Sequence, residues 1–144
     1  MKKSTRIAVA LLALILVAAL LVISVPVPLL SMLSVPEGEN WVCEVVRDPA
    51  EESARIELDA NRTEVLVRRM EHVKVRFGGL ADGHFVTGWV YLHHVDAESG
   101  ERLDTFRLHV NGTGDLWVDD LNFVLVGEDG AAFREALEEA IAAP

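Results

Sequence analysis

One long apolar run near the N-terminus limits what this chain can fold into more than any other feature. The nineteen residues Ile7–Val25 are alanine, leucine, isoleucine or valine, with Ser24 as the one polar member. As a helix rising about 1.5 Å per residue, the run spans roughly 28 Å, close to the ~30 Å hydrocarbon core of a bilayer. Helical bonding also satisfies every backbone group, as lipid requires. Residues 7–25 therefore predict a transmembrane signal-anchor helix in contact with the lipid bilayer.

Two other interpretations of this run stay open. A cleaved signal peptide has a shorter apolar region, of about 7–15 residues, followed by a small-x-small cleavage site. Residues 25–31, which follow the run, contain no Ala-x-Ala sequence. The other alternative is a hydrophobic helix buried inside a soluble protein. We expect an uncleaved anchor, whose regular helix ends where Pro26 and Pro28 begin.

The charges on either side of the run predict its orientation. Lys2, Lys3 and Arg6 precede it, whereas no lysine or arginine follows it before Arg47. The positive-inside rule then places the N-terminus in the cytoplasm. We expect a single-pass cell-membrane protein with four parts: a basic cytoplasmic tail (1–6), the anchor (7–25), a juxtamembrane linker (26–40) and an extracytoplasmic domain (41–144).

The composition of the region after the anchor excludes several classes of protein. The whole chain has a formal charge of -10, and residues 37–144 hold 10 basic and 23 acidic side chains. Nucleic acid would be repelled by such a surface, so it is not an expected partner. A single cysteine, Cys43, rules out a disulfide scaffold and is expected in the core. Asn-x-Thr sequons at Asn61 and Asn111 are compatible with an exterior location.

Alternation of apolar and polar residues, typical of half-buried strands, runs through most of the domain. It predicts strands around Trp41–Val45 and Ile56–Leu58, and one long or two shorter strands over Thr63–Phe77 after a turn at 59–62. Further strands are expected at Leu116–Val118 and Leu121–Val126.

The clearest supersecondary signal is a hairpin that joins residues 85–96 to residues 102–110. Its loop ends in Gly100, which suits the left-handed position of such a turn. The expected register places Trp89, Tyr91 and His93 on one face. On the other face it pairs Val90 with Leu108, Leu92 with Phe106 and His94 with Asp104.

A helix is expected at the C-terminus. Phe133, Leu137 and Ile141 recur at a spacing of four residues, and Asp129 is able to cap the first turn. These patterns together predict a mainly β fold. In it the transmembrane helix precedes a small antiparallel β sandwich or barrel-like meander, with one C-terminal α-helix at 129–142.

A basic stripe is expected within the strand region 63–77. Arg68, Lys74 and Arg76 share strand parity there, on an otherwise acidic domain. One interpretation is a solvated sheet face paired with neighbouring carboxylates. The other is a partner-binding surface for an acidic protein or for anionic headgroups near the anchor.

Candidates for chemistry are few. The register predicts a His94–Asp104 pair, but no H-x-H or H-E-x-x-H spacing occurs. Ser53 and Ser99 are not part of a G-x-S-x-G elbow. We therefore expect no catalytic residue, no metal and no cofactor. The five histidines are His72, His84, His93, His94 and His109.

These observations favour a non-enzymatic binding, assembly or envelope-structural role, with other membrane or envelope proteins as partners. One alternative is a tethered or secreted metal-dependent hydrolase that uses the histidines. The other is a small-ligand carrier with an apolar cavity under the helix.

Overall fold

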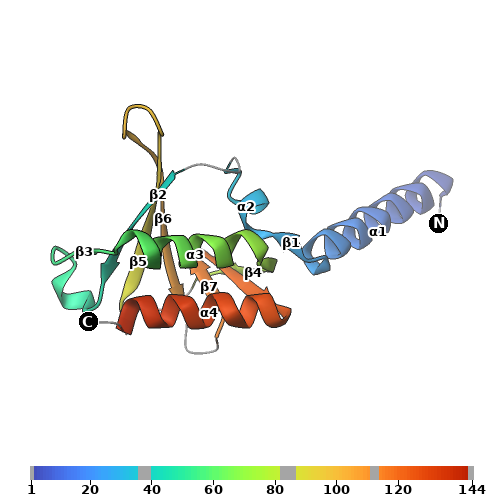
Figure 1. The fold of residues 1–144 in the computed structure, drawn as a ribbon. Coiled ribbons are helices and arrows are strands. Elements are labelled where there is room, and N and C mark those ends of the chain that lie inside the picture. Colours follow the sequence, from blue (N-terminus) through green and yellow to red (C-terminus); the bar gives the residue numbers. More distant parts are fainter. Residues whose placement is uncertain (1, 36–39, 82–86, 111–113, 143–144) are drawn as a thin grey trace.

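The computed structural model describes residues 2–35, 40–81, 87–110 and 114–142 (Figure 1). The helices are α1 (Lys3–Ser24), α2 (Leu29–Met32), α3 (Ala60–His72) and α4 (Gly127–Ala142), with a short 3₁₀ turn, η1, at Pro49–Glu51. The strands are β1 (Val27–Pro28), β2 (Asn40–Val46), β3 (Ile56–Glu57), β4 (Lys74–Leu80), β5 (Trp89–Val95), β6 (Arg102–Val110), β7 (Leu116–Val118) and β8 (Leu121–Val126).

The eight strands of the described residues form one open antiparallel sheet, in the order β1-β4-β8-β7-β6-β5-β2-β3. Helices α3 and α4 lie next to each other across one face of this sheet (Figure 1). The predicted sandwich or barrel is therefore wrong. The fold is a mixed α/β arrangement of two layers, because the apolar face of the sheet is covered by helices and the strand order does not close on itself.

Helix α3 replaces much of the strand predicted over 63–77, and the predicted turn at 59–62 is the start of this helix. The Asp59 carboxylate caps it by accepting a hydrogen bond of 2.8 Å from the Arg62 backbone N–H. Buried Thr63, Leu66 and Met70 follow at helical spacing. Only residues 74–80 of the region continue as a strand, β4. The strand prediction failed because it followed the alternating valines of this region and not the helical spacing of Thr63, Leu66 and Met70.

The hydrophobic core lies between the sheet and the two helices. Gly127, with φ of +70°, lets the chain turn from β8 directly into α4. Helix α4 then buries Phe133 and Leu137 completely, against Leu108, Leu116 and Phe123 of the sheet. Cys43 is also fully buried, which confirms its predicted place in the core.

The predicted hairpin register is confirmed. Strands β5 and β6 pair Val90 with Leu108 and Leu92 with Phe106, and Gly100 has φ of +72°. One irregularity was not predicted: after His94 the pairing shifts, so that Val95 lies opposite Arg102.

Helix α1 extends away from the two-layer domain (Figure 1), and none of its residues is buried. It is long and apolar enough to cross a membrane, a property that signal sequences share. The segment after it belongs to the domain. Strand β1 pairs with β4, and fully buried Leu29 donates its backbone N–H to the Val73 carbonyl at 3.0 Å. Val27–Pro28, which we expected in the juxtamembrane linker, thus form the outermost strand of the sheet.

Candidate functional site

The sheet face that points away from α3 and α4 holds the main polar cluster of the described residues. Alternation along β5 directs Trp89, Tyr91 and His93 to this face, as the hairpin register predicted. Across the strands, Glu44 lies opposite Tyr91, and Thr105 lies opposite His93. His93 is only 2% exposed, so its ring needs polar partners within the protein.

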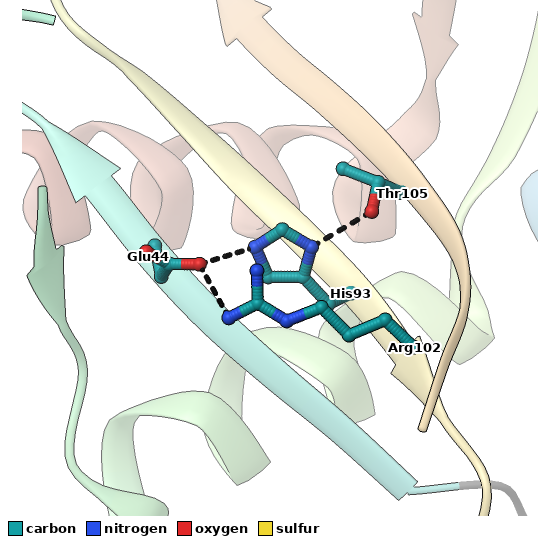
Figure 2. Close-up of polar contacts among 4 residues, drawn as sticks. All are labelled: Glu44, His93, Arg102 and Thr105. Atoms are coloured by element: carbon teal, nitrogen blue, oxygen red, sulfur yellow. Dashed lines mark hydrogen bonds and ion pairs between the residues drawn. The ribbon is translucent and has the colours of Figure 1, made fainter. Parts of the chain in front are cut away.

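Those partners come from the two neighbouring strands (Figure 2). The Nε2 atom of His93 lies 2.6 Å from Glu44 Oε1 on β2, and its Nδ1 atom lies 2.8 Å from the Thr105 hydroxyl on β6. The Arg102 guanidinium lies 2.8 Å from the same oxygen of Glu44. A buried imidazole is therefore held between a carboxylate and a hydroxyl, and an arginine offsets the charge of the carboxylate.

Arg102 reaches this face because of the irregularity between β5 and β6. With strict alternation from Thr105, Arg102 would point to the helix side. The shift after His94 leaves one extra residue on β6 and places Arg102 opposite Val95. Val95 has the same parity as His93, so Arg102 lies on the face where His93 and Glu44 meet.

The electrostatics of the cluster favour a neutral His93. Burial lowers the pKa of His93 most, and the nearby positive charge of Arg102 lowers it further, while Glu44 opposes both effects. Because a carboxylate only accepts, the 2.6 Å contact between Nε2 and Glu44 favours the tautomer that carries its proton on Nε2. In the neutral ring Nδ1 then accepts from the Thr105 hydroxyl.

The order of hydroxyl, imidazole and carboxylate is also that of an activated nucleophile. Such chemistry needs, in addition, donors for an oxyanion and a cleft for substrate beside the hydroxyl. The two grooves described below lie along α3 and not beside Thr105. In the described residues, the clear effect of the cluster is to tie β2, β5 and β6 together through a buried polar group.

Aromatic and charged contacts extend the cluster along β5. The Tyr91 ring stacks on His93 at 6.3 Å, and the Arg55 guanidinium lies 4.1 Å above Tyr91. The Tyr91 hydroxyl donates to Glu52 at 2.6 Å. Sequence reasoning missed Glu44, Glu52 and Arg55, because their role depends on pairing between β2 and β5, which no local pattern reveals.

The predicted pair and stripe residues lie elsewhere. His94 Nδ1 is 3.7 Å from Asp104 Oδ2, with His94 buried on the helix side of the sheet. Arg68 lies on α3, where it pairs with Glu64, whereas Lys74 and Arg76 are exposed on β4. The expectation that Arg68 shares strand parity with Lys74 and Arg76 is therefore wrong, because Arg68 lies on α3, which ends before Lys74. Partner binding by these residues stays a prediction.

The histidines of the described residues do not converge. His72 is on α3, His93 and His109 share the open face, and His94 points to the helices, while His84 lies outside the described residues. Within the ranges that the structure describes, no three His, Cys, Asp or Glu side chains are grouped to hold a metal ion. Burial raises the pKa of the Cys43 thiol to about 12, which disfavours the thiolate that metals bind.

Because His93 and His109 are buried, we expect the folded domain to lose stability in weak acid. Burial is the main cause that lowers the pKa of both from 6.5, and the backbone carbonyl of Gly88 only partly opposes it at His109. The native state then binds fewer protons than the unfolded state, so stability is complete above pH 6.5 and declines as the pH falls below it. Urea unfolding of the full chain in detergent, followed from about pH 7.5 to about pH 5.5, measures this decline.

Histidine variants provide the control for this pH-dependent unfolding experiment. The double variant His93→Gln and His109→Gln is expected to flatten the decline, whereas His72→Gln, exposed on α3, is expected to leave it unchanged. An equal decline in the wild type and in the double variant would contradict the assignment to His93 and His109.

Two open grooves run along α3. The first, of about 510 Å³, lies between α3 and the edge of β2, with Trp41, Leu58 and Val67 in its lining. We call it the β2–α3 groove. The second, of about 590 Å³, lies between α3 and α4 and includes Val65 and Ala136. Beneath the C-terminal helix, where the small-ligand-carrier alternative requires an apolar cavity, lie core side chains that include Phe133 and Leu137.

The features of the described residues that bear on function are α1, the polar cluster and the β2–α3 groove. Comparisons with protein-family models, with curated proteins and with solved structures give no match to this chain.

Proposed function

We propose that this chain is a single-pass membrane protein, in which α1 anchors a small two-layer domain with a non-enzymatic binding, assembly or envelope-structural role. One observation carries the proposal: α1 is a 22-residue apolar helix with no buried residue. A helix of a soluble domain buries its apolar face. Here Leu14 is 65% exposed and Val22 is 77% exposed, an apolar surface that lipid would cover.

The charge pattern supports an extracytoplasmic position for the domain. Lys2, Lys3 and Arg6 lie at the N-terminal end of α1, the end that the positive-inside rule assigns to the cytoplasm. The anchor would hold the domain at the outer surface, where its effective concentration for neighbouring membrane proteins is high.

The polar cluster supports a binding or structural role over catalysis. Its carboxylate is shared between His93 and Arg102, and its hydroxyl is used by His93. In the described residues, these groups contact one another and connect three neighbouring strands of the sheet. The β2–α3 groove offers a surface for a partner.

Membrane fractionation with protease protection tests the proposal. The full chain is expected in the membrane pellet, resistant to extraction by salt and alkali, with a mass that still includes residues 1–25. A protease added outside intact cells is expected to digest the domain, and to spare it in inside-out vesicles.

Two results would overturn the proposal. A soluble mature chain that lacks residues 1–25 would identify α1 as a cleaved signal sequence. A domain digested only in inside-out vesicles would place it in the cytoplasm.

A further inference from the structure

The outer edge of β2 is only partly paired. Strand β5 pairs with β2 along its whole length, from Asn40 to Val46. On the other side, β3 pairs only with Glu44 and Val45. The chain then leaves the sheet at Leu58, because Asp59 caps α3. Among the described residues, no strand lies beside Asn40–Val42 on this edge.

The backbone at this edge is oriented for pairing. Leu58 N–H donates to the Cys43 carbonyl at 2.9 Å, so the polar backbone groups of Cys43 point to the outer side. These groups alternate in direction along a strand. The N–H and C=O of Trp41, two residues earlier, therefore also point outward, toward the place where a continued β3 would lie.

The β2–α3 groove occupies that place. Trp41 and Val42 of β2 form one side, and Leu58 lies at the point where the chain departs from the sheet. Thr63 and Val67 of α3 form the other side. An extended segment placed in the groove would thus have strand backbone on one flank and a helix on the other.

The charges around the groove indicate the chemistry of its occupant. Glu57, Glu64 and Glu71 line it with one basic residue, Arg68, which already pairs with Glu64. Neither Glu57 nor Glu71 has a basic partner among the described residues. Glu71 faces the groove from α3, whereas Glu57 pairs opposite Glu44 and lies at the end of the groove with its side chain on the open face of the sheet. A second copy of the chain would bring the same carboxylates to its own edge, and like charges would repel.

We propose that the β2–α3 groove binds an extended, lysine- or arginine-bearing polypeptide segment, which adds as a strand to the free edge of β2. Main-chain hydrogen bonds at Trp41 hold the segment. Its alternate side chains contact the apolar lining or the carboxylates of Glu57 and Glu71. This inference rests on the proposed binding role and deepens it by naming the surface and the partner's chemistry.

A model peptide tests the proposal on the full chain in detergent micelles. A capped peptide of alternating lysine and valine is expected to bind and to slow hydrogen exchange at the Trp41 amide. The same peptide with N-methylated backbone amides keeps its charge but cannot pair as a strand, so its affinity is expected to fall at least tenfold. A peptide of alternating glutamate and valine is expected not to bind.

Matched variants separate the groove from the general acidity of the domain. Replacing Glu57→Gln and Glu71→Gln together is expected to weaken binding about threefold to tenfold. Glu135→Gln with Glu138→Gln, exposed on α4, makes the same change of charge and is expected to leave binding unchanged.

Three outcomes would overturn the inference: no binding of the lysine peptide, equal binding of its N-methylated form, or equal weakening by both pairs of variants. A chain that dimerises through the β2 edge and excludes the peptide would overturn it as well. Each of these results leaves the membrane fractionation untouched, so failure of this inference is distinguishable from failure of the anchor.

Discussion

The full chain with Leu14→Arg and Ile15→Arg is expected to leave the membrane fraction while its domain stays folded. An arginine at the centre of a membrane helix costs about 2.5–3.5 kcal/mol on insertion scales, so two of them prevent stable insertion. The domain is unaffected because α1 buries no residue against it. Fractionation measures the first effect, and the urea midpoint from tryptophan fluorescence measures the second.

The matched control is Leu14→Ala with Ile15→Ala, which shortens the same side chains without adding charge. This variant is expected to remain in the membrane pellet. An arginine variant that unfolds the domain would instead place α1 in the protein's interior. One that stays membrane-bound would show that another part of the chain holds the protein there.

Phe133→Ala is expected to destabilise the domain by about 3–5 kcal/mol. The Phe133 ring is fully buried where α4 meets the sheet, and its removal leaves a cavity in addition to the lost burial. Small domains are stable by only about 5–15 kcal/mol, so the change removes a large part of the total. Urea unfolding of the full chain in detergent gives the difference in free energy of unfolding.

Glu135→Ala is the control for this prediction, since it lies on the exposed side of the same helix. Its expected effect is within about 0.5 kcal/mol. If Phe133→Ala costs no more than Glu135→Ala, then α4 does not pack on the sheet as described.

Features that depend on local spacing could be predicted from the sequence. The apolar run of α1 lies within one segment, and so does the four-residue repeat of Phe133 and Leu137 in α4. The β5–β6 register was also predictable. A short loop ending in Gly100 joins the two strands, and the apolar parity leaves one arrangement that buries Val90 and Leu92.

The candidate site was much less predictable. His93 and Thr105 belong to the hairpin, so their shared face followed from its register. Glu44 comes from β2, whose pairing with β5 spans more than forty residues of sequence. Arg102 reaches the cluster only through the shift after His94, which reverses the side expected from its parity. No local sequence pattern predicts the pairing of β2 with β5 or the register shift after His94.

Side-chain periodicity within a short stretch of chain specifies the apolar helix, the hairpin and the amphipathic C-terminal helix, so each follows from local sequence. The pairing of β4 with β8 and of β2 with β5, and the helical state of residues 60–72, are set by long-range packing instead. Those choices depend on which apolar surfaces cover one another. The sheet needed a second helix to bury its face, and Thr63, Leu66 and Met70 provide it.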